Sequence, residues 1–119
     1  MANILIVDDD IQIQKLFVSQ LSRRGDLCKT AGTMHDAMAL LADDNFAILF
    51  LDIYLPDGNG VDFLSAVLEE HPSLLVIMIT GSNELEFIEK AIVSGAWDYL
   101  KKPFSLASLD QLIERAMVV

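Results

Sequence analysis

The first candidate functional residues in this sequence are aspartates that directly follow apolar segments. Asp8–Asp10 come straight after the segment Ile4–Val7. Asp52 follows a second apolar segment, Ala47–Leu51, in the same way. If the two segments are adjacent parallel strands, their carboxyl ends bring these carboxylates to one rim, where like charges repel unless a cation lies among them. Because all the ligand atoms are oxygens, this pattern favours Mg2+.

Two further polar side chains occupy similar positions. Thr80 follows the apolar segment Leu74–Ile79, and Lys102 comes shortly after Trp97–Leu100. If all four segments belong to one parallel sheet, an anionic pocket gains one hydroxyl and one ammonium group. A hydroxyl and an ammonium beside bound Mg2+ are suited to holding the oxygens of a phosphoryl group.

Length and composition indicate a single folded domain over residues 1–119. A chain of 119 residues can bury roughly two-thirds of its unfolded surface in one core. Hydrophobic residues make up 53% of the chain and charged residues only 22%, which excludes a disordered chain. No internal repeat or linker divides the sequence.

The charge of the chain argues against nucleic acid or an anionic membrane as a direct partner. The formal net charge is −10. No Lys or Arg occurs between Lys29 and Lys90, a stretch that holds eleven acidic residues. A nucleic-acid-binding face needs a basic stripe, so this distribution predicts other partners.

The cysteine count and the N-terminus favour a cytoplasmic setting. Cys28 is the only cysteine, so an internal disulfide is impossible, and the residue is expected to pack as a small apolar side chain. The N-terminus lacks the basic start of a signal peptide. No apolar run approaches the length needed to span a bilayer.

Short apolar runs alternate with helical patterns along the whole chain. The runs predict five strands, at Ile4–Val7, Leu27–Ala31, Ala47–Leu51, Leu74–Ile79 and Trp97–Leu100. Apolar residues at helical spacing predict five helices, around Ile13–Leu21, Ala37–Leu41, Val61–Leu68, Leu85–Ile92 and Leu109–Ala116. This alternation predicts an α/β fold with a doubly wound parallel sheet, whose ligands collect at the carboxyl ends of the strands.

Four motifs identify a family that the chain resembles. They read ILIVDDD (4–10), LDIYLPDGNG (51–60), MITGS (78–82) and DYLKKPF (98–104). In their order and approximate spacing they resemble the signatures of two-component response-regulator receiver domains, and the resemblance covers essentially the whole chain. It implies a flavodoxin-like fold with five helices and the strand order 2-1-3-4-5.

The resemblance also implies a role for each motif residue. Asp52 is similar to the family's phosphoacceptor, which takes a phosphoryl group from a sensor histidine kinase. Asp9 resembles the direct Mg2+ ligand and Asp8 the one that acts mainly through coordinated water. The resemblance further implies that the backbone carbonyl of Tyr54 binds the metal and that Lys102 and Thr80 bind the phosphoryl group. It also implies that Tyr99 is the aromatic switch and that the Lys102-Pro103 peptide is cis.

Structural alternatives stand beside several of these roles. Asp10 is expected to cap the following helix rather than bind metal. Taken alone, Asp8 and Asp9 would also be interpreted as helix caps. Because Asp52 and Lys102 are expected at the same rim, metal binding by Asp8 and Asp9 is favoured instead. Tyr99 is either the switch or a packed aromatic with its hydroxyl at the surface. Further caps are predicted at Thr33, Ser82 and Ser105, and Gly25 and Gly95 are expected to end helices. Asp57 is expected to serve turn geometry and is left out of the site.

Tyr54 carries a prediction of its own. It stands two residues after the expected phosphoacceptor and is bulky. With Ser82 it would flank the path of attacking water in the family arrangement. We therefore expect Tyr54 to shield the acyl phosphate and to prolong its lifetime.

The sequence supports a phospho-receiver signalling module above two other functions. An Mg2+-dependent aspartyl-phosphate phosphohydrolase commonly has an aspartate two residues after its nucleophile, where this chain has Tyr54. Only self-phosphorylation from small phosphodonors and slow self-dephosphorylation are therefore expected. The intact set of polar residues argues against a phosphorylation-independent interaction domain. Expected partners are a sensor histidine kinase, an effector domain or protein, and a second copy of the chain on phosphorylation. The segment 95–100 resembles receivers of ATPase-type enhancer-binding transcription activators.

Overall fold

The computed structural model describes residues 2–81 and 85–118 of the chain. Two elements of the described structure, β4 and β5, are very short and form a separate hairpin. The strands are β1 (Asn3–Val7), β2 (Leu27–Ala31), β3 (Ile48–Asp52), β4 (Tyr54–Leu55), β5 (Gly58–Asn59), β6 (Leu75–Thr80) and β7 (Asp98–Lys101). The helices are α1 (Ile11–Arg24), α2 (Met34–Asp43), α3 (Gly60–Glu70), α4 (Leu85–Val93) and α5 (Leu106–Met117).

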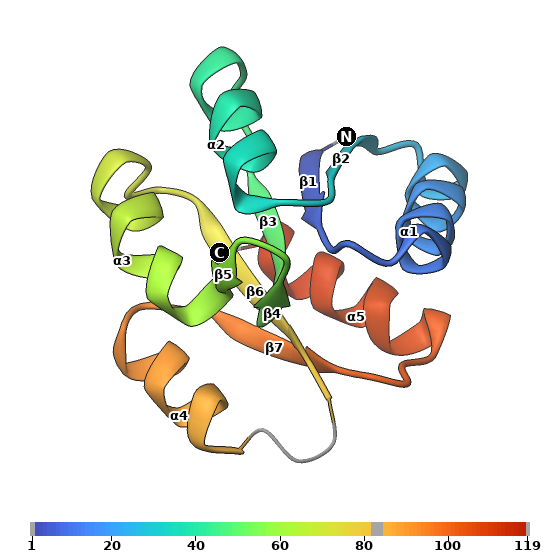
Figure 1. Cartoon of the computed structure of the whole chain (residues 1–119). Helices are drawn as coiled ribbons and strands as arrows, with labels where there is room; N and C mark the ends of the chain where they lie inside the picture. The colour runs from blue at the N-terminus through green and yellow to red at the C-terminus, as the bar shows by residue number, and fades with distance from the viewer. Residues whose placement is uncertain (1, 82–84, 119) are drawn as a thin grey trace.

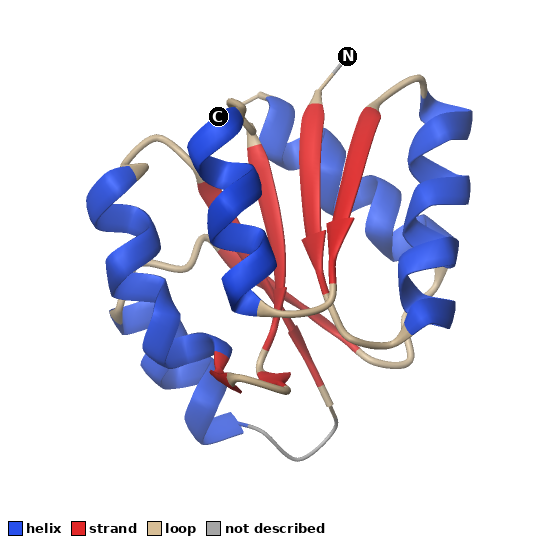
Figure 2. Ribbon diagram, turned by 45° about the horizontal axis from the view of Figure 1, so that its top comes forward, coloured by secondary structure: helices blue, strands red, loops and turns tan. Residues whose placement is uncertain are grey.

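Five of the strands form one parallel sheet in the order β2-β1-β3-β6-β7. Numbered among themselves these strands run 2-1-3-4-5, so the predicted doubly wound fold and its five helices are confirmed. Figure 2 shows the strand arrows of this sheet pointing the same way, toward the end of the molecule where the β4–β5 hairpin lies. The strand order reverses beside β1, which makes the carboxyl ends of β1 and β3 the expected position of a ligand site.

The sheet separates two hydrophobic layers (Figure 1). Residues of α2, α3 and α4 pack on one face, and residues of α1 and α5 pack on the other. The central strand β3 is buried at all five positions, as expected of a parallel strand covered on both faces. Because alternate residues face opposite layers, Leu51 packs under α2 and α3 while Phe50 packs under α1 and α5.

Helix ends follow the predicted capping residues. The Asp10 carboxylate accepts hydrogen bonds from the backbone N–H groups of Gln12 and Ile13 at 2.8 and 3.4 Å, so it caps α1 as predicted. Gly25 ends the same helix in the left-handed region, at φ +83°, where a side chain would be strained. Thr33 and Ser105 cap α2 and α5 as predicted. The predicted cap at Ser82 lies outside the described residues.

Two boundaries differ from the prediction in a way that matters for the site. β3 ends in Asp52 itself and β6 ends in Thr80 itself, whereas the sequence placed both residues just beyond their strands. Pairing continues to these positions, because Asp52 lies opposite Ile79 in the sheet register and Thr80 lies opposite Lys101. Both residues are therefore held by strand backbone rather than by a loop.

The hairpin of β4 and β5 is an element that the sequence did not predict. Tyr54 pairs with Asn59 and Leu55 pairs with Gly58 in antiparallel fashion. The N–H of Gly60 donates to the carbonyl of Ile53 at 2.6 Å and closes this loop against the end of β3. The hairpin thus fixes the segment that immediately follows Asp52. Within the described residues, no helix combines the length and the apolar character that crossing a membrane requires.

Candidate functional site

Three carboxylates meet at the carboxyl ends of β1 and β3. Asp8, Asp9 and Asp52 each contribute one oxygen to a group whose members all lie within 4.8 Å of one another. Asp8 and Asp9 follow the last residue of β1, which pairs with Leu51 of β3. The predicted convergence at one rim is therefore present in the structure.

Asp8 is the buried member of this cluster. Its side chain is fully buried, and its Oδ1 accepts a hydrogen bond from the backbone N–H of Asp10 at 2.9 Å. Its backbone carbonyl accepts one from the side-chain amide of Gln14 at 2.6 Å. Asp8 Oδ2 lies 2.9 Å from Nζ of Lys102 and has no other partner among the described residues. A buried carboxylate needs such a cation nearby, because an uncompensated charge is strongly unfavourable in the interior.

Lys102 lies between two of the carboxylates. Its Nζ is 2.9 Å from Asp8 Oδ2 and 3.6 Å from Asp52 Oδ2. Burial opposes the charge of this ammonium, but the contacts with Asp8 and Asp52 outweigh burial and raise the pKa of Lys102 above its ordinary value. Its backbone N–H donates to the carbonyl of Thr80 at 2.6 Å, and the peptide to Pro103 is cis, as predicted. Lys102 is thus a fixed positive charge at the rim.

The environment of Asp52 disfavours its ionised form. Burial is the main cause and repulsion from Asp8 the next, and together they raise the pKa of Asp52 to about 6, although Lys102 acts in the opposite direction. The nearby backbone N–H of Tyr54 also acts in the opposite direction and favours the ionised form of Asp52. A further cation beside Asp52 would therefore stabilise its ionised form.

The carboxylate cluster fits a small divalent cation. Its donor atoms are all oxygens, which Mg2+ prefers, and Mg2+ commonly takes only a few protein ligands and keeps several waters. Asp9 is exposed at the rim, whereas Asp8 already faces Lys102. The division between a direct ligand at Asp9 and a ligand through water at Asp8 stays a prediction. Asp8 Oδ2, buried with the ammonium as its one described partner, is a further acceptor facing the site.

Thr80 presents a hydroxyl at the same edge of the sheet. Its side chain is fully buried, and its Oγ1 has no hydrogen-bond partner among the described residues. A buried hydroxyl without a partner is unfavourable, so the position needs an explanation beyond packing. A bound phosphoryl oxygen would provide the acceptor.

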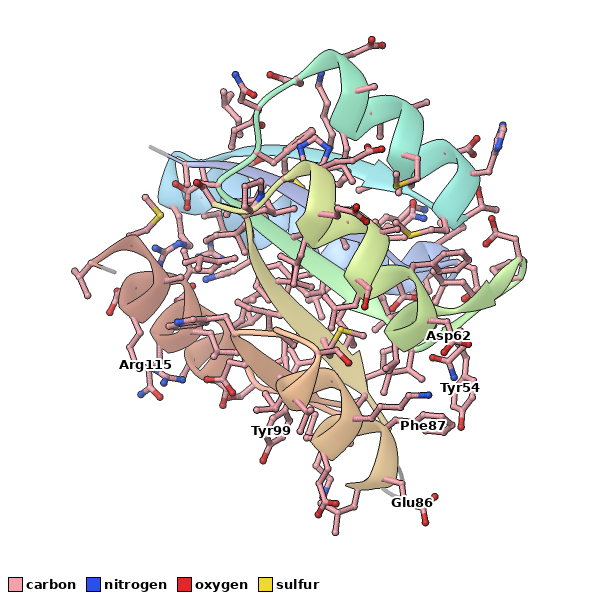
Figure 3. All side chains as sticks on the ribbon, turned by 90° about the vertical axis from the view of Figure 1, so that its left-hand side faces the viewer. Tyr54, Asp62, Glu86, Phe87, Tyr99 and Arg115 are labelled. Atoms are coloured by element: carbon pink, nitrogen blue, oxygen red, sulfur yellow. The ribbon has the colours of Figure 1, made fainter. Side chains whose placement is uncertain are left out.

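Tyr99 lies on β7 close to Thr80. It is opposite Met78 in the sheet register, and Met78 and Thr80 are two residues apart on β6. In-register neighbours in a parallel sheet share a face, so the side chains of Tyr99 and Thr80 lie on the same face of the sheet. Tyr99 is 42% exposed, and Figure 3 shows its ring pointing away from the core. It lines an open cavity of about 600 Å3 together with residues of α5, including Arg115.

Tyr54 does not cover the rim as a buried side chain. Its ring is 56% exposed and packs against Phe87 of α4, with ring centroids 5.8 Å apart and ring planes at 83° (Figure 3). Edge-to-face packing of this kind is a preferred aromatic geometry. The ring is therefore held beside the site by a helix that the sequence analysis did not connect with it.

Two residues near the site have functions that the sequence did not reveal. Asp57, which was expected to serve turn geometry, also contacts α2, because its carboxylate accepts hydrogen bonds from the backbone N–H groups of Met34 and His35 at 3.0 and 2.9 Å. Asp57 thus caps α2 from the loop that follows β3. Gly60 has the backbone carbonyl of Asp52 where a Cβ would lie, so a side chain cannot be placed there without a shift. Neither contact leaves a local pattern in the sequence. The sequence shows a glycine at position 60, but it does not show that this glycine lies against Asp52.

Comparison with known families supports the resemblance. The family model described as response regulator receiver domain matches residues 4–114. The match spans all the residues of the site, from Asp8 to Lys102.

Curated relatives carry the same domain as part of a longer protein. The chain is 35% identical over 115 residues to the DNA-binding transcriptional regulator NtrC of Proteus hauseri, covering 97% of this chain and 24% of that protein. It is 35% identical over 113 residues to the response regulator protein PilR of Pseudomonas aeruginosa, covering 95% and 25% respectively. The chain thus spans about a quarter of the length of these relatives.

Solved structures agree in fold and extent. The receiver domain of NtrX from Brucella abortus superposes with a TM-score of 0.93 at 35% identity, over 98% of this chain and 99% of that one. The beryllofluoride-activated NtrC4 receiver domain dimer gives a TM-score of 0.92 at 34% identity, over 98% and 96%. With matching motifs, topology and site geometry, the chain belongs to the response regulator receiver domain family of two-component systems.

Proposed function

We propose that the chain is a phosphoryl-accepting switch in which Asp52 is the phosphoacceptor. The observation that carries this proposal is the position of Lys102, which lies between Asp8 and Asp52. At the same edge is the hydroxyl of Thr80, which has no hydrogen-bond partner among residues 2–81 and 85–118. A nucleophile, an ammonium and a free hydroxyl donor are the groups that phosphoryl transfer needs from the protein.

The transfer step is a displacement at phosphorus. A carboxylate oxygen of Asp52 attacks the phosphorus of a phosphohistidine on the sensor kinase, and the new P–O bond forms as the P–N bond breaks. The electron pair of the broken bond returns to the imidazole of the kinase. Lys102 pairs with the phosphoryl oxygens, and Thr80 donates a hydrogen bond to one of them. Catalysis by the protein is mainly positioning and charge stabilisation.

The carboxylate cluster would hold Mg2+ through Asp9, Asp52 and the backbone carbonyl of Tyr54, with Asp8 acting through coordinated water. When bound, Mg2+ supplies positive charge that offsets the roughly two negative charges of the phosphoryl group. The oxygen-only donor set and the raised pKa of Asp52 support this assignment.

The change on phosphorylation would pass from Thr80 to Tyr99. A phosphoryl oxygen that draws the Thr80 hydroxyl toward Asp52 changes the space on the face that Thr80 shares with Tyr99. Tyr99 is half exposed and can move inward, which would alter the surface formed by β7 and the last two helices. That surface would bind an effector domain, a protein partner or a second phosphorylated copy. The activated NtrC4 receiver, which was solved as a dimer, supports the last possibility.

The relatives support a place for the chain within transcription regulation. NtrC is described as a DNA-binding transcriptional regulator, and this chain corresponds to about a quarter of it. We infer that the domain regulates a transcription activator of the ATPase type in the cytoplasm, under a sensor histidine kinase. The net charge of −10 supports the view that any DNA contact is made by another domain.

The direct experiment is phosphorylation by a small donor. Incubation with acetyl phosphate and Mg2+ should add one phosphoryl group, detected by intact mass, and Asp52→Asn should abolish the addition. Asp62→Asn is the matched control, because Asp62 is an exposed carboxylate on α3 that does not belong to the cluster of Asp8, Asp9 and Asp52. Addition of the phosphoryl group to Asp52→Asn would refute the assignment of the phosphoacceptor.

Two outcomes would favour another function. Rapid multiple turnover of an ordinary phosphomonoester would identify a phosphohydrolase. Partner binding that does not change on phosphorylation would identify an interaction domain that works without phosphate.

A further inference from the structure

The hairpin of β4 and β5 connects the candidate metal site to the start of α2. Its first strand carries Tyr54, whose backbone carbonyl is a proposed Mg2+ ligand, and its turn carries Asp57. The two carboxylate oxygens of Asp57 accept hydrogen bonds from the backbone N–H groups of Met34 and His35, at 3.0 and 2.9 Å respectively. Figure 1 shows the loop of the hairpin next to the first turn of α2. One short loop therefore joins the end of β3 to a helix that contributes no residue to the site.

The hairpin needs contacts with the rest of the domain to keep its position. Each of its strands has only two residues, and a single short hairpin is not stable by itself. Among residues 54–59, Leu55 is the only buried one. The base of the hairpin is closed by the hydrogen bond from the N–H of Gly60 to the carbonyl of Ile53. At the turn, the hydrogen bonds of Asp57 fix the hairpin to α2.

These two hydrogen bonds are charge-assisted. Asp57 lies at the N-terminus of α2, where free N–H groups and the helix dipole favour a negative charge. The N–H groups of Met34 and His35 hold the pKa of Asp57 below its ordinary value, so the carboxylate is ionised at neutral pH. The same helix has a second cap, because the Thr33 hydroxyl oxygen accepts a hydrogen bond from the N–H of Asp36 at 3.1 Å. Helix α2 thus has one cap from the segment that leads into it and one from the hairpin.

We propose that Asp57 is a positioning residue for the metal site, which couples the binding of Mg2+ to the N-terminus of α2. The inference rests on the proposed Mg2+ site at Asp9, Asp52 and the Tyr54 carbonyl. Asp57 restricts the hairpin to the position seen in the structure, and Mg2+ bound to the Tyr54 carbonyl would restrict the hairpin to the same position. By linkage, each of these two contacts strengthens the other by the same factor. The N-terminus of α2 then responds to occupancy of the rim, on a different element from Tyr99.

The test compares Mg2+ binding to two cap variants by titration calorimetry at neutral pH. Asp57→Ala and Thr33→Ala each remove one cap of α2, but only Asp57→Ala releases the hairpin. Loss of a helix cap corresponds to a factor of about five, so we expect Asp57→Ala to raise the Mg2+ dissociation constant about fivefold. Thr33→Ala should leave the dissociation constant unchanged, although it also weakens α2.

Asp57→Asn separates the hydrogen bonds from the charge. The amide removes the negative charge but keeps an acceptor oxygen for one of the two N–H groups. We expect a dissociation constant between those of the wild type and Asp57→Ala. If Asp57→Asn and Asp57→Ala weaken Mg2+ binding equally, the effect is one of charge alone and the positioning role is overturned.

Amide exchange measures the same coupling from the side of the helix. In the unphosphorylated wild-type protein, Mg2+ should slow the exchange of the Met34 and His35 amides by about the same fivefold factor. This slowing should persist in Thr33→Ala and disappear in Asp57→Ala. An effect of Mg2+ on these two amides that is unchanged in Asp57→Ala would overturn the inference.

Failure of this inference can be distinguished from failure of the proposed function. If the wild-type protein binds no Mg2+, the proposed metal site fails and the inference fails with it. If Mg2+ binds and acetyl phosphate phosphorylates Asp52, but Asp57→Ala and Thr33→Ala bind Mg2+ equally well, only the role of Asp57 is overturned.

Discussion

Replacing Asp52 with asparagine should stabilise the metal-free protein at pH 8, because the fold disfavours the ionised form of this carboxyl. Burial, followed by repulsion from Asp8, raises the pKa of Asp52 from 3.8 to about 6. The folded state therefore binds a proton more tightly than the unfolded state does. By linkage, the free energy of unfolding falls as pH rises between these two values, and the loss is complete above about pH 7.

The size of the effect follows from the same two values. A difference of one in pKa corresponds to about 1.4 kcal/mol, so the full effect of Asp52 is about 3 kcal/mol. Solvent reaches the rim and screens part of the repulsion, and Asp52→Asn also weakens the contact with Lys102. We therefore expect a stabilisation of about 1–2 kcal/mol at pH 8, and little or none at about pH 3, where Asp52 is largely protonated in both states.

The assay is urea unfolding followed by circular dichroism in the presence of a chelator, with the free energy obtained by linear extrapolation. Asp62→Asn, at an exposed position on α3, should change the stability little at either pH. Added Mg2+ should stabilise the wild-type protein more than Asp52→Asn, because one ligand is lost in the variant. An Asp52→Asn variant that is no more stable than wild type at pH 8 without metal would refute the electrostatic reasoning.

Three other predictions follow from the contacts of the site. Gly60→Ala should lower the free energy of unfolding by about 1–3 kcal/mol in urea, because its Cβ would meet the carbonyl of Asp52. Asp57→Ala should lower the urea midpoint and the amide-exchange protection of α2 fully above about pH 4 and progressively less as the pH falls further, since two backbone N–H groups hold the pKa of Asp57 below its ordinary value. Asp43→Asn, at the other end of α2, is its control. Lys102→Met should slow phosphorylation by acetyl phosphate about a hundredfold, because the ammonium no longer pairs with the phosphoryl oxygens. Calorimetry should still detect Mg2+ binding to this variant, because the ammonium is not a metal ligand. Loss of Mg2+ binding would contradict this prediction.

The fold was predictable because its strands carry an unambiguous pattern. A strand such as β3, buried at every position, reads as a continuous apolar run, and the intervening helices have apolar residues at helical spacing. The β4–β5 hairpin was not predictable in this way. Each of its strands has two residues, which is too short for any periodicity, and its geometry depends on the close approach of Gly60 to Asp52.

The site was predictable as far as strand ends determine it. Asp8, Asp52 and Thr80 could be placed at one rim from the sequence because parallel strands end at the same edge of a sheet. The contacts of Asp57 with α2 and of Tyr54 with Phe87 join segments more than twenty residues apart. Such contacts depend on how helices pack on the finished sheet, and a single sequence carries no signal for them.

The charges at the rim explain why Lys102 should move when Asp52 is phosphorylated. Three carboxylates face one ammonium, and a bound Mg2+ would bring the rim close to neutral. Conversion of the Asp52 carboxylate to an acyl phosphate adds about one further negative charge there. In the unphosphorylated protein Nζ of Lys102 lies 2.9 Å from Asp8 but 3.6 Å from Asp52. If Asp52 carries the phosphoryl group, we expect the added charge to draw the ammonium of Lys102 away from Asp8 and toward Asp52.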